Sequence, residues 1–283
     1  MTEPLFEEQR ASFHAALLKG PLSFDGNVWA NADKRNKSSS SLAAGIAARI
    51  IEDPETRDKQ AGQTSGAEFE VAVCDYIRTC FEKLPHLRPG RWNFYVKDAA
   101  ALSRFEQYAH LAEIERLAKE HEELKVVLGN DYLIKPDILV SREPETDRFI
   151  NRDEWLVNDD VAIRASIRSD KSPFEVLHAS VSCKWTIRSD RSQNSRTEAL
   201  NLIRNRKGHL PHIAIVSAEP LPSRLVSVAL GTGDIDCMYH FALPELQQSL
   251  EEFGLEDQAD QLRTLVDGKR LKDISDLPLD LAV

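Results

Sequence analysis

The chain has 283 residues, 42% of them hydrophobic, which is enough to bury one large core or two smaller ones. No apolar run approaches the length of a membrane span, the N-terminus does not resemble a signal peptide, and the four cysteines form no CxxC pair. These features argue against a membrane protein, a zinc site and a disulfide scaffold, and we expect a protein of the reducing cytoplasm.

The formal net charge of −10 counts against tight, non-specific binding to nucleic acid, because phosphate contact requires positive surface. The charge is unevenly distributed, however. Residues 184–207 carry 7 basic and 2 acidic residues, whereas residues 245–283 carry 4 basic and 10 acidic residues. A basic patch on an acidic body is compatible with DNA binding.

The N-terminal part of the chain predicts three helices, over residues 5–18, 42–51 and 67–84. Between the first two, residues 20–41 have loop-like composition and could form either a mobile surface loop or an arm that touches a ligand. Glu70 lies one residue away from the apolar face of the third helix. On its own it is typical of a solvated acid that the helix dipole favours.

The middle of the chain predicts a strand over 92–96, helical structure over 100–128, and a short buried strand over 137–140. Asp137 begins that second strand directly after a proline. It is either a turn residue or a ligand at the edge of the sheet. Residues 143–175 are polar and poorly periodic, which predicts a loop with an embedded strand or short helix.

The C-terminal part alternates strands and helices. It predicts strands over 176–184, 212–217 and 235–241, helices over 188–206 and 243–266, and a turn-rich connection over 220–233 that carries Arg224. We therefore expect an α/β or α+β fold, with a central mixed β-sheet of about five strands flanked by helices. A single domain over residues 1–283 is expected.

The junction between the strand at 176–184 and the following helix concentrates unusual residues. By alternation, Lys184 ends the strand on a polar face, together with Ser182, His178 and Ser180. On the helix, Glu198 shares a face with Ser195, Ala199, Leu202 and Ile203. A carboxylate in such a stripe is costly unless something compensates it, which suggests a function.

Asp137, Ser182, Lys184 and Glu198 form a candidate set for phosphodiester hydrolysis. Carboxylates supply Mg²⁺ sites, and an adjacent lysine can orient or deprotonate a water molecule and stabilise developing charge. The pattern corresponds to the PD…(D/E)xK arrangement, except that Ser182 stands where an acid is expected. Glu198 can reach back toward the strand end and replace that acid, although the motif alone also occurs by chance.

Arg188, Asp190 and Arg191 fall at the start of the same helix. Arginine can donate two hydrogen bonds to guanine O6 and N7, and aspartate can accept one from cytosine N4, so this cluster suits G·C-rich DNA. The alternative is an ordinary helix start with solvated salt bridges. The residues alone leave both interpretations open.

Beyond these spacings, the sequence resembles the type II restriction endonucleases of the CCGG-recognising group, within the PD-(D/E)xK nuclease superfamily. The resemblance covers nearly the whole chain and is weakest over 34–41 and 143–175. It is carried by residues 182–194 (SCKWTIRSDRSQN), 201–208 (NLIRNRKG), 62–66 (GQTSG), 107–111 (QYAHL), 229–233 (ALGTG) and 268–283 (GKRLKDISDLPLDLAV).

The resemblance implies a restriction-endonuclease-like core and a bacterial, Mg²⁺-dependent enzyme of a restriction–modification system. Such an enzyme cuts double-stranded DNA at a palindrome built on CCGG, here expected to be GCCGGC, and leaves 5′-phosphates and 5′ overhangs. It also implies a homotetramer that binds two DNA copies, with no membrane association.

The resemblance further implies roles for individual residues. Asp137, Lys184 and Glu198 match a permuted active site, and Glu70 matches a further acid near the metal. Ser182 and Cys183 match the residues that precede the lysine, with the Cys183 carbonyl as a metal ligand. The remaining matches are DNA contacts: Arg188, Asp190 and Arg191 to CCGG, and Asp33, Gln63 and Arg224 to the outer base pair and the minor groove. Asp33 is followed here by Lys34-Arg35, where the family has small residues.

Two other functions compete with this one. A repair or junction nuclease with the same core would cut branched or damaged DNA, but the arginine-rich cluster suits direct reading of bases. A DNA-binding regulator would bind without cutting, but Glu70, Asp137 and Glu198 would repel phosphate without a metal ion between them.

Overall fold

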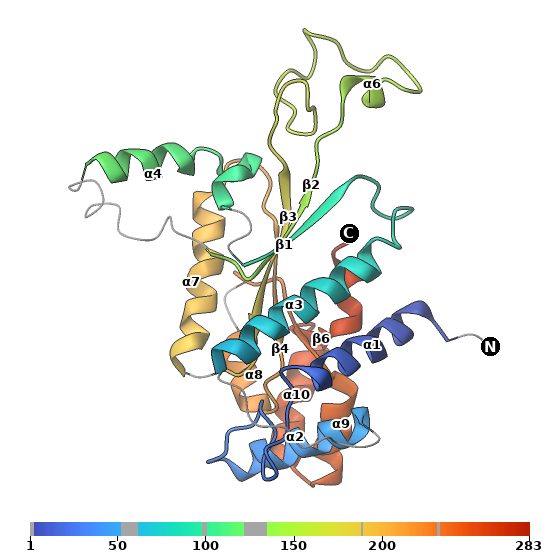
Figure 1. Cartoon of the computed structure of the whole chain (residues 1–283), viewed down its shortest axis with the longest axis vertical. Helices are drawn as coiled ribbons and strands as arrows, with labels where there is room; N and C mark the ends of the chain where they lie inside the picture. The colour runs from blue at the N-terminus through green and yellow to red at the C-terminus, as the bar shows by residue number, and fades with distance from the viewer. Residues whose placement is uncertain (1–2, 52–61, 98–100, 122–134, 188, 231–232) are drawn as a thin grey trace. The chain divides into compact units, whose positions relative to one another are not determined.

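The computed structural model describes residues 3–51, 62–97, 101–121, 135–187, 189–230 and 233–283. Its helices are α1 (Leu5–Lys19), α2 (Lys37–Ile50), α3 (Gly62–Phe81), α4 (Leu111–Glu120), α6 (Asp147–Ile150), α7 (Ser189–Asn205), α8 (Pro222–Ala229), α9 (Leu243–Glu252), α10 (Glu256–Asp267) and α11 (Leu277–Asp280) (Figure 1). Its strands are β1 (Trp92–Val96), β2 (Ile138–Arg142), β3 (Val176–Lys184), β4 (His212–Ser217), β5 (Cys237–His240) and β6 (Leu271–Asp273). None of the helices within these ranges combines the length and apolar character needed to cross a bilayer.

The strands form one six-stranded mixed sheet in the order β1-β2-β3-β4-β5-β6. β1 and β2 are antiparallel, with Phe94 opposite Val140, whereas β5 is parallel to both β4 and β6. The expected mixed sheet with flanking helices is therefore confirmed. It has one strand more than expected, because β6 is only three residues long and too short to show a period.

The chain divides into two compact units. The first unit contains Met1–Arg88, Val181–Thr197 and Ile213–Val283, and the second contains Pro89–Ser180 and Glu198–His212. Each unit is assembled from separated segments of the chain. The expectation of a single domain over 1–283 stays a prediction.

In the first unit, helices pack against the parallel strands. The ring of Phe13 in α1 lies 5.2 Å from that of Tyr76 in α3, and His14 in α1 bonds the carbonyl of Phe241 at 2.8 Å. α2 packs beside α9 (Figure 1). The four cysteines of the chain are buried free thiols.

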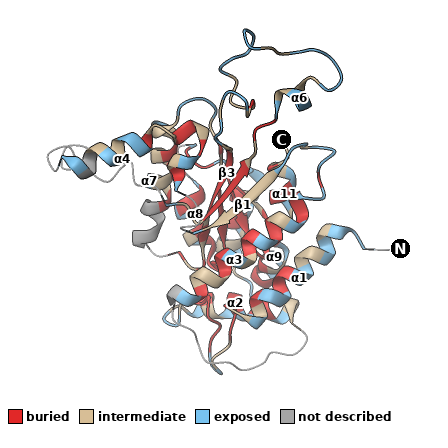
Figure 2. Cartoon of the chain, turned by 45° about the horizontal axis from the view of Figure 1, so that its top comes forward, coloured by how far each residue is buried: buried red, intermediate tan, exposed pale blue. Residues whose placement is uncertain are grey.

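In the second unit, the side chain of Gln107 fixes β3 by bonding both the N–H and the carbonyl of Leu177, at 2.9 and 2.7 Å. Residues 143–175 are largely irregular apart from α6, as their weak periodicity predicts. Figure 2 shows this excursion mostly exposed. It is held together by Arg168, whose buried guanidinium pairs with Asp147 and donates to main-chain carbonyls of the excursion.

Four predicted elements were wrong in extent or kind. α2 begins at Lys37, because Asn36 caps it by accepting from the Ser39 N–H, so the serine run is helical. The expected helix over 100–128 is reduced, within the described residues, to 3-10 turns and α4. The expected connection over 220–233 contains α8, which begins with Pro222 in its first turn. The expected helix over 243–266 is two helices, broken at Gly254, whose φ is 62°.

Gly45 permits the close approach of α2 to α9. A Cβ atom at Gly45 would lie 2.7 Å from the Ser249 hydroxyl and 2.9 Å from the Phe253 ring. We expect Gly45→Ala to lower the free energy of unfolding by about 1–3 kcal/mol through overpacking. Urea denaturation measures this. Gly66→Ala is the matched control, because nothing lies within 4 Å of its Cβ position and alanine favours the helix. Equal effects of the two substitutions would contradict the account.

His240 makes folding stability depend on pH. Its Nδ1 accepts from the Ala242 N–H at 3.1 Å and its Nε2 bonds the carbonyl of Glu219 at 3.2 Å, which requires a neutral ring with the proton on Nε2. Burial lowers the pKa of His240 from 6.5 to about 4. Its stabilising contribution is therefore complete above the unfolded pKa and is lost as the pH falls from 6.5 toward 4.

Between pH 7 and pH 5, this one group should lower the free energy of unfolding by about 2 kcal/mol. Urea denaturation at the two pH values measures the change. His240→Asn should show a smaller loss than the wild type, whereas His86→Gln, which alters an exposed histidine, should match the wild type. An equal loss in all three proteins would show that other groups control the acid response.

Candidate active site

Lys184 ends β3, and its main chain is fixed to the neighbouring strand. Its carbonyl accepts from the Ala218 N–H and from the Ser217 hydroxyl, both at 3.1 Å. Val181 and Cys183 are buried whereas Ser182 and Lys184 are half-buried, which confirms the predicted alternation at the strand end. The ammonium of Lys184 therefore lies on the more open face, where it donates to the Ser182 hydroxyl at 3.4 Å.

Two of the three residues after Lys184 are anchored by other parts of the chain. The buried ring of Trp185 packs edge-on against Phe69 of α3, with ring centroids 5.3 Å apart. The N–H of Ile187 donates to the carboxylate of Glu219 at 2.8 Å. The segment that follows β3 is thus fixed at Trp185 and Ile187.

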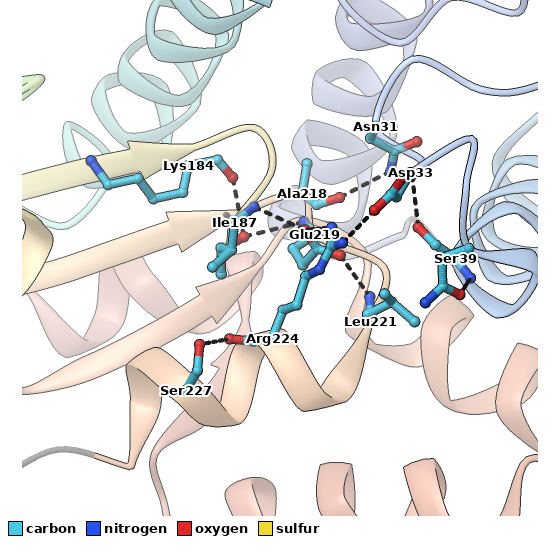
Figure 3. A network of polar contacts seen from close by, with 12 residues as sticks. Asn31, Asp33, Ser39, Lys184, Ile187, Ala218, Glu219, Leu221, Arg224 and Ser227 are labelled. Carbon is cyan, nitrogen blue, oxygen red and sulfur yellow. Dashed lines mark hydrogen bonds and ion pairs between the residues drawn. The ribbon is translucent and has the colours of Figure 1, made fainter. Parts of the chain in front are cut away.

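The structure brings together two predicted DNA-contact residues that lie far apart in sequence. Arg224 of α8 pairs with Asp33 at 2.5 Å (Figure 3). Asp33 is itself held, because its carboxylate accepts from the Arg35 N–H at 3.0 Å and its own N–H donates to Ser39 at 2.9 Å. The segment around Asp33 is therefore an ordered arm against α8.

Two of the predicted metal ligands lie in the same unit as Lys184. Glu70 is buried on α3, next to Phe69, which packs on Trp185. It is thus not the solvated acid that its position off the apolar face suggested. Cys183 is also buried, directly before the lysine. Gln63 belongs to the first turn of α3, and its side chain lies outside what the structure describes.

Asp137 and Glu198 belong to the second unit. Asp137 directly precedes β2, and its carbonyl accepts from the Lys97 N–H at 2.9 Å. Glu198 is half-buried on α7, beside the buried residues Ser195, Ala199 and Leu202. The stripe predicted for this helix is confirmed as buried at Ser195, Ala199 and Leu202, whereas Ile203 is half-buried.

The remaining predicted base-reading residues cannot be placed in the same way. Arg188 lies outside the described residues, and so do the side chains of Asp190 and Arg191, whose main chain belongs to the first turn of α7. Their roles stay predictions.

The candidate metal ligands supply oxygen donors only: the carboxylates of Glu70, Asp137 and Glu198 and the carbonyl of Cys183. Such donors suit Mg²⁺ rather than zinc. Among the residues that the structure describes, no three His, Cys, Asp or Glu side chains form a metal-binding group. Mg²⁺ commonly takes only one or two protein carboxylates and completes its shell with water and substrate phosphate, so the donor chemistry fits this ion.

Glu219 is a completely buried carboxylate that follows β4 and that was not among the residues predicted from sequence. It accepts from the N–H groups of Ile187 and Leu221 and from the Arg224 guanidinium. Burial raises the pKa of Glu219, while those donors oppose the shift. The only local signal is an acid directly after an apolar strand, and that signal does not reveal its distant partners.

Comparison with known proteins connects this arrangement to one family. The family model described as NgoMIV restriction enzyme matches residues 13–283 of the chain. The type II restriction enzyme NgoMIV of Neisseria gonorrhoeae is 50% identical over 287 residues, which cover 99% of this chain and 99% of that enzyme.

Proposed function

The chain belongs to the NgoMIV restriction enzyme family, and on this premise we propose that it hydrolyses double-stranded DNA at GCCGGC in a Mg²⁺-dependent reaction. It is a type II restriction endonuclease; the site and the ends, with 5′-phosphates and 5′ overhangs, are the proposal. The observation that carries it is the 50% identity along the full length of the relative. The fixed position of Lys184 at the end of β3 supports it.

In the proposed reaction, Lys184 is the catalytic lysine. Its ammonium orients the attacking water and offsets the negative charge that develops on the phosphate, whereas removal of a proton from that water would require the neutral amine. The Ser182 hydroxyl accepts a hydrogen bond from that ammonium at 3.4 Å and so restricts the positions that the ammonium can take. The proposed magnesium ligands are Asp137, Glu198, Glu70 and the Cys183 carbonyl. One or two of these carboxylates would suffice for the ion, with water and the substrate phosphate completing its shell. When bound, that ion activates water and neutralises charge on the phosphate.

DNA reading is divided between two groups of residues. Arg188, Asp190 and Arg191 at the start of α7 read the CCGG core in the major groove. Asp33, Arg224 and Gln63 contact the outer base pair and the minor groove. The Asp33–Arg224 ion pair supports this assignment, because it presents an acceptor and a donor from one fixed position.

We also propose a homotetramer that binds two DNA copies in the bacterial cytoplasm. Exposed large apolar side chains in the 143–175 excursion support self-association: Phe149, Trp155, Leu156, Val161 and Ile163. Light scattering should give a mass four times the 31.9 kDa of the chain. A monomeric mass at micromolar concentration would remove this part of the proposal.

Digestion of a sequenced plasmid with Mg²⁺, followed by sequencing of the ends, tests the proposed function. We expect cuts only at GCCGGC, with 5′ overhangs. Cleavage without sequence preference, or only of branched DNA, would instead indicate a repair nuclease. Binding of a CCGG duplex that stays intact in Mg²⁺ would indicate a DNA-binding regulator.

A further inference from the structure

Glu219 is a fully buried carboxylate that joins three parts of the first unit (Figure 3). One oxygen accepts from the Ile187 N–H at 2.8 Å and from the Arg224 guanidinium at 3.4 Å. The other oxygen accepts from the Leu221 N–H at 3.1 Å. A buried carboxylate is retained at low cost only when donors surround it in this way, and both oxygens of Glu219 are used.

The partners of Glu219 are the residues whose positions matter for reading DNA. Ile187 lies between Lys184 and α7. The hydrogen bond from its N–H therefore fixes the segment that links the lysine to the proposed base-reading helix. Leu221 is the N-cap of α8, and Arg224 lies in the first turn of that helix. Arg224 then extends to Asp33 at 2.5 Å. One carboxylate therefore connects this junction to the Arg224–Asp33 pair.

The turn that carries Glu219 is attached to the same two regions through its main chain and the Ser217 hydroxyl. Its residues Ser217 and Ala218 bond the carbonyl of Lys184, each at 3.1 Å. The Ala218 carbonyl accepts from the buried side-chain amide of Asn31 at 2.9 Å, two residues before Asp33. A displacement of the Asp33 arm or of Arg224 would therefore be transmitted to the strand end that bears the lysine.

We propose that Glu219 is the positioning residue for recognition of the outer base pair. By holding the Arg224 guanidinium and the Ile187 main chain on one carboxylate, it fixes Arg224 relative to the segment that begins with Lys184. Efficient cleavage then requires the correct outer base pair. This inference rests on the proposed function, which assigns Arg224 and Asp33 to that base pair.

Single-turnover cleavage of three DNA duplexes in Mg²⁺ tests the proposal. The first contains GCCGGC, the second contains ACCGGT with a changed outer base pair, and the third contains GCGCGC with changed inner bases. The Ile187 and Leu221 N–H groups bond different oxygens of Glu219. A glutamine replaces one of these oxygens with an NH2 donor, so one of the two hydrogen bonds is lost. For Glu219→Gln we expect the cleavage rate of the first duplex, divided by that of the second, to fall about tenfold. The rate of the first duplex divided by that of the third should stay unchanged.

Matched controls separate positioning from loss of stability. Glu245→Gln removes a largely buried carboxylate that pairs with Arg10 at 2.6 Å, away from this network. Ser227→Ala removes a hydroxyl that bonds the Arg224 carbonyl within α8 at 2.7 Å. Both should keep the wild-type rate ratios, even if Glu245→Gln lowers the melting temperature as much as Glu219→Gln does.

Glu219→Asp provides a second variant if the glutamine protein does not fold. It keeps the charge but is one methylene shorter, so it cannot span the same donors, and it should also lose outer-pair discrimination. Wild-type discrimination in both variants would overturn the inference and leave the proposed function intact. If the wild type itself cleaves GCCGGC and ACCGGT equally, the outer-pair assignment and this inference both fail.

Discussion

Replacing Lys184 with alanine should lower the rate of DNA cleavage by about 1000-fold and leave DNA affinity in Ca²⁺ within a few fold of the wild type. The reason is that Lys184 is held through its main chain, whose carbonyl bonds Ala218 and Ser217. Removing the side chain deletes the ammonium near the reacting phosphate without releasing the strand. Single-turnover kinetics and gel-shift titration measure the two quantities.

Lys83→Ala is the control for loss of one positive charge, because Lys83 is exposed just after α3. It should cleave at the wild-type rate. The role of Lys184 would be contradicted if its alanine variant still cut efficiently. Loss of both binding and thermal stability in that variant would show that the lysine is structural.

The second large effect concerns Asp137. Asp137→Asn keeps the shape of the side chain but removes the negative charge with which it would hold the magnesium ion, so we expect cleavage to fall by about 100–1000-fold. In the absence of any divalent ion, the same substitution should strengthen DNA binding, because one carboxylate no longer repels phosphate. Cleavage assays in Mg²⁺ and binding assays in EDTA measure the opposite changes.

Because cleavage should fall while metal-free DNA binding strengthens, the two measurements distinguish a metal ligand from a structural residue. A purely structural role for Asp137 would weaken cleavage and metal-free binding together. Asp153→Asn, on an exposed residue of the 143–175 excursion, is the matched control and should change neither. Unchanged cleavage by Asp137→Asn would remove it from the active site.

Strong periodic patterns accounted for most of the fold. β1 and β4 have the predicted bounds, and β3 ends at Lys184 as its alternation indicates. The wrong predictions of secondary structure occur where a single residue determines the local structure and the surrounding composition suggests a different one. Asn36 caps a helix through a serine run, and Pro222 begins a helix where prolines suggested a turn.

The candidate site was predictable only in part, because local patterns identify residue types but not distant partners. Lys184 could be placed from the period of its strand. The pairing of Arg224 with Asp33 was not evident from spacing, since the two residues are 191 positions apart. Glu219 was missed for the same reason. The role of a buried acid depends on the hydrogen-bond donors that other segments contribute, which here are Ile187 and Arg224.

We propose that the junction from Val181 to Glu198 couples base reading to hydrolysis. β3 carries the lysine, and α7 carries the proposed base-reading residues and Glu198. Between Lys184 and Arg188, Trp185 is anchored by Phe69 and Ile187 by Glu219. A change at the bases therefore has a short covalent path to the reacting phosphate, so specificity should appear in the rate of cleavage as well as in binding.

Single-turnover cleavage of two duplexes of identical composition, one with GCCGGC and one with GCGCGC, tests this claim most directly. With Mg²⁺ and saturating enzyme, we expect rapid cleavage of the first duplex and none of the second, and no cleavage of either in EDTA. Equal cleavage of both duplexes, or cleavage of neither in Mg²⁺, would contradict the account.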